Sequence, residues 1–311
     1  MSDIILQTNQ LSKRFSKRIL AVDALDLTIS RNQIFGILGP NGSGKTTTLG
    51  MVLGVVSITN GTYSWFEKGD DFSLRKRIGA ILEQPNFYPF LSASQNLIVH
   101  SRIKDIRNPD TEGLLKLVNL YERRNDPFKT YSLGMKQRLA IASALLADPE
   151  VLIFDEPTNG LDPQGIAEIR KLILDIRDMN KTIILASHLL DEVQKVCSHF
   201  AVLQRGKKIY SGSVADALQQ TNTVLISADA HQPLWESIQS CPGITSSENG
   251  PDVIKVNIAD GWSAASLNKY LVDKNISVNY IQQKKSSLEE KFLDLLRQND
   301  NSQNQPVNIK R

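Results

Sequence analysis

The chain has 311 residues, of which 41% are hydrophobic and 22% charged, and its formal net charge is +3. This composition is typical of a globular protein with one large domain or two smaller ones, and the mild charge predicts no nucleic-acid partner. No apolar run approaches the roughly 20 residues that span a bilayer, and the start lacks the basic and apolar regions of a signal peptide.

The first part of the chain predicts strands at 4–8 and 25–29, which have the residue composition of strands or alternate between apolar and polar residues. Phe15 lies between them. An aromatic ring at this position is suited to stack on an adenine base, and the alternative is packing into the core. The basic run at 13–18 is as consistent with a solvated turn as with a binding role.

Residues 39–46 fit the pattern G-x-x-x-x-G-K-[ST] of a phosphate-binding P-loop. The glycines let the backbone form a concave nest of N–H groups that face anionic oxygens. Lys45 is suited to reach the β and γ phosphates, and Thr46 to offer its hydroxyl to Mg²⁺. A buried strand predicted at 33–38 and a helix predicted from 47 to 53 supply the strand–loop–helix setting that this motif requires.

The next segment first continues the strand pattern and then becomes helical. An Asn-Gly pair predicts a turn at 59–62, and strands are predicted at 63–66 and 78–82, the second ending at Glu83-Gln84-Pro85. Apolar residues then recur at helical spacing within 93–101, 110–121 and 133–146. We therefore expect a helical insert over about 86–147.

A run of four apolar residues at 151–154 ends in Asp155 and Glu156. This pattern predicts a buried parallel strand whose carboxyl end presents two acids where α/β sheets bind ligands. Asp155 is suited to the Mg²⁺ shell and Glu156 to polarise an attacking water. A turn is expected at 158–163 and a helix at about 164–179.

A further buried strand is predicted at 182–186, followed by Ser187 and His188. Because His188 ends a parallel strand beside the nucleotide edge, we expect it to contact a γ-phosphate. The other histidines lack such a position and are interpreted as structural or surface residues. A helix is predicted at 189–196 and a hairpin at 200–210, and the two cysteines, far apart in sequence, are expected to be free thiols.

Taken together, these motifs over about residues 3–215 resemble the ATP-binding subunit of an ABC (ATP-binding cassette) transporter. The resemblance assigns Phe15 to the adenine platform and residues 39–46 to Walker A. It assigns Gln84 to the Q-loop, residues 131–135 to the signature motif, and Asp155 and Glu156 to Walker B and its catalytic glutamate. Residues 159–162 correspond to the D-loop and His188 to the switch histidine.

The signature departs from the common Leu-Ser-Gly-Gly-Gln, because it reads Tyr131-Ser132-Leu133-Gly134-Met135. The Ser132 hydroxyl and the Gly134 N–H, at a helix N-terminus, remain suited to bind a γ-phosphate. In the family, one subunit's signature completes its neighbour's ATP site, which implies a head-to-tail homodimer around two ATP molecules. This variant resembles subunits of bacitracin- and lantibiotic-type exporters.

Beyond about residue 220 the predicted order is β-α-β-β-α-β, typical of a ferredoxin-like unit, followed by a last helix through Leu296. The expected fold is thus an α/β P-loop ABC cassette at 1–217 with a small α+β domain at 218–296, and a disordered tail at 297–311. An accessory dimerisation or partner-contact role is favoured for the second domain, with a ligand sensor as the alternative.

The resemblance implies an ATP- and Mg²⁺-dependent ATPase that drives a transmembrane permease from the cytoplasmic face of the membrane, as an exporter of drug, antibiotic-peptide or lipid-like cargo. The alternatives are a soluble ABC ATPase and a regulatory ABC protein. The predicted catalytic residues are Glu156, His188 and Gln84, and the predicted metal ligands are Thr46, Gln84 and Asp155. The predicted nucleotide-binding residues are Phe15, Gly39, Pro40, Asn41, Gly42, Ser43, Gly44, Lys45, Thr46, Thr47, Ser132, Gly134 and Asp162.

Overall fold

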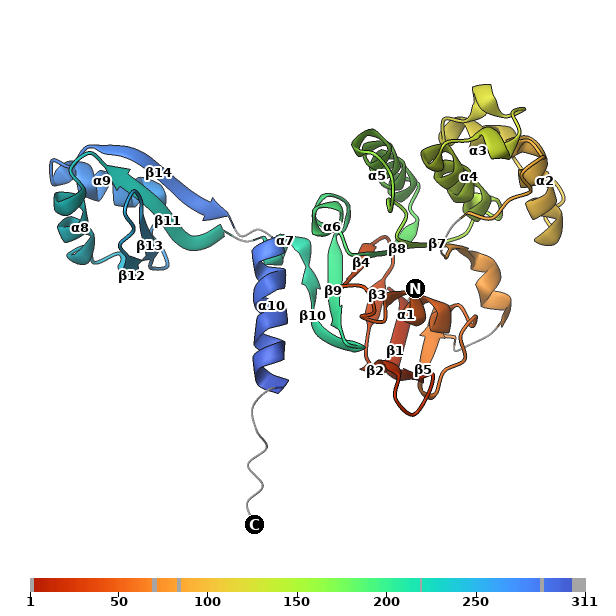
Figure 1. The fold of residues 1–311 in the computed structure, drawn as a ribbon, viewed down its shortest axis with the longest axis horizontal. Coiled ribbons are helices and arrows are strands. Elements are labelled where there is room, and N and C mark those ends of the chain that lie inside the picture. Colours follow the sequence, from red (N-terminus) through yellow and green to blue (C-terminus); the bar gives the residue numbers. More distant parts are fainter. Residues whose placement is uncertain (1–2, 69–71, 83–84, 219, 286–287, 304–311) are drawn as a thin grey trace, which may run out of the picture. The chain divides into compact units, whose positions relative to one another are not determined.

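The structure, a computed structural model, describes residues 3–68, 72–82, 85–218, 220–285 and 288–303 (Figure 1). Its strands are β1 (Ile4–Arg14), β2 (Leu20–Leu25), β3 (Thr28–Ser30), β4 (Ile34–Leu38), β5 (Asn60–Trp65), β6 (Ile78–Ile81), β7 (Val151–Asp155), β8 (Thr182–Ser187), β9 (His199–Gln204), β10 (Lys207–Ser213), β11 (Gln220–Ala228), β12 (Ile244–Glu248), β13 (Ile254–Ile258) and β14 (Val278–Lys285). Its α-helices are α1 (Lys45–Val52), α2 (Ala93–Ile103), α3 (Thr111–Leu117), α4 (Leu133–Leu145), α5 (Pro163–Asp178), α6 (Leu190–Val196), α7 (Val214–Ala217), α8 (His231–Gln239), α9 (Ala264–Asp273) and α10 (Leu288–Gln303). Short 3₁₀ helices are η1 (Phe72–Arg77), η2 (Tyr121–Arg123) and η3 (Phe128–Thr130).

The chain folds into two compact units. The first comprises the described residues up to Val214 together with those from Phe292 to Gln303, and the second comprises the described residues between Ala215 and Lys291. Each unit has its own apolar core. Within the described part of the chain, every helix is too short or too polar to cross a lipid bilayer.

The central sheet of the first unit has the strand order β10-β9-β4-β8-β7-β6. All neighbours from β9 to β6 are parallel, and β10 pairs antiparallel with β9 at the edge. Strands β4, β7 and β8 are buried throughout, as their unbroken apolar runs predict for a parallel sheet covered on both faces. Their carboxyl ends meet at one edge, and the segments that follow β4, β7 and β8 carry the predicted site.

The antiparallel sheet is built around β1, which pairs with β2, β3 and β5. Two predictions were wrong here. The expected strand at 25–29 is interrupted, because both carboxylate oxygens of Asp26 accept hydrogen bonds from Gln10 instead of the chain continuing its ladder. The Asn-Gly pair is not a turn but the start of β5, where Gly61 has a φ of 83° opposite an irregularity of β1. The pair thus marked a left-handed residue in a bulge rather than a hairpin.

The helical insert contains α2, α3 and α4, as its periodicity predicted. Helix α2 begins with a capping box in which Ser92 and Gln95 satisfy each other's backbone N–H groups. The expected helix at 110–121 is shorter, because α3 ends at Leu117 and the chain resumes only as the 3₁₀ helix η2. Helix α4 contacts α2, α3, α5 and β6, so it joins the insert to the central sheet.

The second unit confirms the predicted β-α-β-β-α-β order, with an antiparallel sheet of order β12-β13-β11-β14. Its core holds the inward residues of β11 and β13 together with Leu234, Leu267 and Leu271 of α8 and α9. The last helix was predicted to end at Leu296, but α10 continues to Gln303. Residues 297–303 contain no glycine or proline that would stop a helix, so their polar composition alone was a poor guide. The rest of the expected tail, 304–311, lies outside the described residues. Both cysteines are free and buried.

Candidate functional site

The loop between β4 and α1 has the shape that its glycines predict. Gly42 and Gly44 have φ values of 79° and 103°, in the left-handed region that glycine adopts without strain. A Cβ on Gly44 would lie 2.6 Å from the backbone oxygen of Ala21, so both conformation and space require glycine there. Gly44 is the residue before the first turn of α1, which directs the backbone N–H groups of that turn at the loop.

Lys45 is buried, with 6% of its side chain exposed. Its ammonium group donates hydrogen bonds to the backbone oxygens of Gly39, at 2.8 Å, and Pro40, at 3.4 Å. It also lies 3.3 Å from Oε1 of Glu156. The cation of the loop is therefore held by carbonyl and carboxylate oxygens at the mouth of the nest, where phosphate oxygens are suited to take their place.

Glu156 directly follows β7 and has a φ of 49°, so the chain turns sharply once it leaves the sheet. Its Oε2 atom lies 2.8 Å from Nδ1 of His188, and its backbone N–H donates to Ala186 in β8. Its other oxygen faces Lys45. The ends of β7 and β8 and the phosphate-binding loop thus meet at the Glu156 carboxylate. Lys45, Glu156 and His188 lie together, as the sequence predicted.

A pocket of about 390 Å³ extends from the loop to Phe15. It is lined by Phe15, Ile19, Leu20, Ala21, Asn41, Gly42, Ser43, Gly44, Lys45, Thr46, Thr47 and Glu156. Phe15 is 57% exposed and is therefore not a core residue, which removes the alternative left open from the sequence. An exposed ring at one end and a phosphate nest at the other fit the two ends of an adenine nucleotide.

A second pocket, of about 350 Å³, is lined by Thr46, Asp155 and Glu156 among others. A hydroxyl and one carboxylate suit Mg²⁺, which usually takes few protein ligands and completes its shell with phosphate oxygens and water. Nearby, the buried Ser43 hydroxyl has no hydrogen-bond partner among the described residues, as a phosphate-binding loop allows. These donors fit a magnesium–nucleotide complex. No group of three or more His, Cys, Asp or Glu side chains that could hold a metal ion occurs in the described residues.

The predicted ligand Gln84 lies outside the described residues. Its neighbour Pro85 lines the pocket that contains Asp155 and Glu156. The side chain of Gln84 is therefore not placed, and its assignment stays a prediction.

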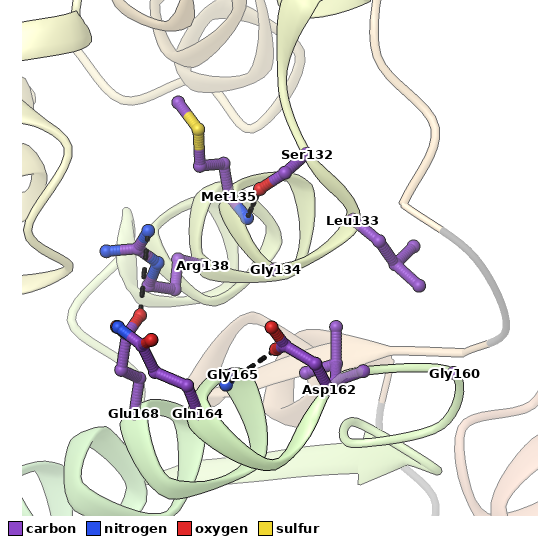
Figure 2. A pocket seen from close by; sticks show the side chains of 11 residues that line it. Ser132, Leu133, Gly134, Met135, Arg138, Gly160, Asp162, Gln164, Gly165 and Glu168 are labelled. Carbon is purple, nitrogen blue, oxygen red and sulfur yellow. Dashed lines mark hydrogen bonds and ion pairs between the residues drawn. The ribbon is translucent and has the colours of Figure 1, made fainter.

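Ser132, Gly134 and Asp162 line a different pocket, of about 370 Å³ (Figure 2). Ser132 caps α4 by accepting a hydrogen bond from the N–H of Met135, and Asp162 caps α5 by accepting one from Gly165. None of these three residues lines the pocket that holds Phe15 and Lys45. The structure therefore brings together most of the predicted nucleotide ligands but leaves the signature residues in a separate hollow.

Sequence reasoning missed several residues that line these pockets. Ile19, Leu20 and Ala21 line the same pocket as Phe15 and the phosphate-binding loop, and they belong to no recognised motif. Gln137 is buried and lines the pocket around Asp155. Its helical spacing of one turn from Leu133 and Gly134 is the signal that could have placed it there.

The geometry agrees with comparisons to known proteins. Residues 22–159 match the family described as ABC transporter. The bacitracin transport ATP-binding protein BcrA of Bacillus licheniformis is 35% identical over 302 residues, 94% of this chain and 97% of the relative. The lantibiotic transport ATP-binding protein SrtF of Streptococcus pyogenes is 37% identical over 215 residues, 67% of this chain and 93% of the relative.

Among solved structures, cbiO1 of Clostridium perfringens, described as part of the ABC transporter complex cbiONQ, is 30% identical with a TM-score of 0.63. The match covers 69% of this chain and 90% of that protein. Its coverage confirms the predicted cassette fold, and the long BcrA alignment extends the relationship over almost the whole chain. The chain therefore belongs to the ATP-binding subunits of ABC transporters, the ATPases that hydrolyse ATP to power transport.

Proposed function

We propose that this chain is the motor subunit of an ABC exporter and that its active sites are completed between two copies. The observation that carries the proposal is the Glu156 carboxylate, which faces Lys45 at 3.3 Å and His188 at 2.8 Å beside the phosphate-binding loop. A base, a phosphate-binding cation and a histidine that meet at one point are the parts needed to hydrolyse a bound nucleoside triphosphate.

The proposed reaction begins when ATP enters the pocket of Phe15 and Lys45. Its phosphates compete with Glu156 for the Lys45 ammonium, which now lies against that carboxylate. Once relieved of this ion pair, Glu156 accepts a proton from the water that attacks the γ-phosphorus. The bond from the γ-phosphorus to the β–γ bridging oxygen breaks, and ADP and phosphate are the products. His188, already hydrogen-bonded to Glu156, keeps the carboxylate oriented and is placed to contact the γ-phosphate.

Thr46, Asp155 and Gln84 are the proposed magnesium ligands. When bound, the metal neutralises charge that develops on the phosphate oxygens. Thr46 and Asp155 line one pocket with Glu156, so the proposed metal ligands adjoin the proposed base.

We propose that the Ser132 hydroxyl and the Gly134 N–H bind the γ-phosphate held by a second copy of the chain. Ser132 is exposed at the N-terminus of α4, and neither residue lines the pocket of Lys45 in its own chain. A head-to-tail dimer would place each signature over the other copy's loop, with Asp162 at the same interface.

The proposed partner is a transmembrane permease that holds the ATPase at the inner face of the membrane. BcrA and SrtF are named as bacitracin and lantibiotic transport proteins, which supports export of an antibiotic-like or lipid-like cargo. Affinity purification of the full chain from membranes should recover a protein with many membrane spans. Recovery of ribosomal proteins in its place would instead favour the soluble ABC ATPase.

We assign residues 1–217 to the cassette and 218–296 to an accessory dimerisation or partner-contact domain. The SrtF alignment supports this division, because it covers 93% of that relative but only 67% of this chain. A relative of about cassette length thus carries a transport name without most of the added domain.

Replacement of the proposed base tests the function. Glu156→Gln keeps the size of the side chain but removes the proton acceptor, so turnover should fall by about 100-fold or more while ATP still binds. The matched control is Glu150→Gln, an acid immediately before the other end of β7, which should leave turnover unchanged. Turnover of Glu156→Gln within about threefold of the wild-type rate, less than 1 kcal/mol, would show that Glu156 is not the base.

A further inference from the structure

At the start of α4 and in the loop that precedes α5, a leucine of each segment lies near a glycine of the other. A Cβ placed on Gly160 would lie 3.2 Å from Cδ2 of Leu133, and one placed on Gly134 would lie 3.9 Å from Cδ2 of Leu161. Each leucine therefore has a methyl group near the glycine of the other segment, and the one at Gly160 is the nearer. Figure 2 shows the Leu133 side chain directed away from Met135 and toward the loop that carries Gly160.

This contact lies between the two parts of the site. Leu133 and Gly160 line the pocket that contains Thr46, Asp155 and Glu156. The same two residues also line the pocket that contains Ser132 and Gly134. Leu133 and Gly160 thus separate the pocket of the carboxylates from the pocket of the signature residues, and they line both.

The loop between Glu156 and Gly160 is short and internally hydrogen-bonded. The N–H of Asn159 donates to the backbone oxygen of Glu156 at 3.1 Å, and the N–H of Leu161 donates to that of Thr158 at 3.3 Å. Gly160 has a φ of 75°, which completes the tight turn. These hydrogen bonds restrict the loop, so we expect a displacement of Glu156 to shift Gly160 as well.

An ion pair ties the same helices together further along. Nη2 of Arg138 in α4 lies 3.7 Å from Oε2 of Glu168 in α5, and its Nη1 donates to the backbone oxygen of Asn119 at 3.0 Å. The segment that starts with Ser132 and α4 therefore meets the segment of Gly160 and α5 at two points, one apolar and one ionic. The apolar point, Leu133 with Gly160, lines a pocket with Glu156, whereas Arg138 and Glu168 do not line that pocket.

We propose that Leu133 is a positioning residue that links the two half-sites carried by one chain. By packing on Gly160 it holds Ser132 and Gly134 in register with the loop that follows Glu156, so the catalytic carboxylate of one ATP site adjusts the signature offered to the other. The common signature has glycine at this position and offers no such side chain. The link rests on the composite sites proposed above and is a property of this variant motif.

A truncation of Leu133 tests the link without opening the core, because this residue is 42% exposed. In the full chain, Leu133→Ala should lower ATP turnover about tenfold, while affinity for a non-hydrolysable ATP analogue at the chain's own loop stays within about twofold. Leu133→Met, which keeps an apolar side chain of similar length, should retain wild-type turnover. Turnover of Leu133→Ala within about twofold of wild type would overturn the proposal.

A double-mutant cycle separates a link through the loop from direct contact between Leu133 and the other copy's nucleotide. Leu161→Ala should also lower turnover, and the double variant should be no slower than the slower single variant, because both changes break one connection. Fully multiplicative losses would contradict the link. Glu156→Gln belongs in the same assay: if it keeps full turnover, the proposed function itself fails, whereas an inactive Glu156→Gln beside a fully active Leu133→Ala rejects the link alone.

Discussion

The site has a loop half, around Lys45 and Glu156, and a signature half, around Ser132 and Gly134. The two halves differ in how many interactions their polar groups make within one chain. In the loop half, Lys45 is buried and its ammonium lies against Glu156 and two backbone oxygens. In the signature half, Ser132 is exposed and its hydroxyl accepts a hydrogen bond from the N–H of Met135 in its own helix. The two halves line separate pockets in one chain, which is the arrangement that the proposed sharing of each ATP site between two copies requires.

The largest expected effect comes from the loop half. Lys45→Ala removes the buried cation that the nest is built around, so nucleotide affinity should fall about 100-fold, near 3 kcal/mol, and turnover should be lost. Calorimetric titration with ATP measures the first and phosphate release the second. Lys195→Ala, an exposed lysine paired with Asp191, is the matched control and should change neither. If Lys45→Ala binds nucleotide with wild-type affinity, the loop half does not bind the phosphates.

The signature half predicts a smaller effect of a different kind. Ser132→Ala should leave nucleotide affinity of the single chain unchanged but lower turnover about tenfold, because the proposed contact is to the other copy's phosphate. The change also removes a helix cap, which lowers stability by about 1 kcal/mol. Ser132→Asp restores a good cap yet adds a negative charge, so turnover should fall further. Recovery of turnover in Ser132→Asp would assign the effect to capping and not to phosphate binding.

The smallest effect is expected at the opposite end of β7, away from both halves. Arg77 and Arg31 hydrogen-bond to the Glu150 carboxylate, and Arg77 contributes most to lowering its pKa from 4.5 to about 2. A carboxylate whose folded-state pKa is depressed stabilises the fold above its unfolded pKa, and this contribution is lost as pH falls from about 4.5 toward about 2. Glu150→Gln should therefore be slightly less stable than wild type at pH 7.

The pH series gives the check on that prediction. The difference in unfolding free energy between Glu150→Gln and wild type, measured with denaturant, should shrink as pH falls through this range. A difference that stays constant with pH would mean that the arginine contacts do not depress the pKa. At pH 7 the turnover of Glu150→Gln should equal that of wild type. The change at Glu150 would then affect stability and neither half of the site.

The sequence predicted the elements of the fold more completely than the connections between them. Unbroken apolar runs identified β4, β7 and β8, and because parallel strands end at one edge, Lys45, Glu156 and His188 could be expected to meet. The Asn60-Gly61 bulge could not be predicted, because it depends on which residues of β1 lie opposite. Contacts between distant segments were also missed.

Leu133 shows why such contacts are hard to predict. In the sequence it is only a departure from a common motif, and its exposed position gives no core signal. The role proposed for Leu133 depends on the left-handed turn at Gly160, which is distant in sequence. Because glycine has no side chain, this turn leaves room for the leucine. The same holds for Arg138 and Glu168, whose pairing follows from the packing of α4 against α5.

Mixing two inactive variants shows whether each ATP site is shared between two copies of the chain. Lys45→Ala destroys the loop half and Gly134→Asp the signature half, so either variant alone should show no turnover. A mixed head-to-tail dimer contains one site in which both halves are intact, and an equal mixture should recover roughly a quarter of wild-type turnover. A mixture that stays as inactive as its components would show that the two halves do not meet across a dimer.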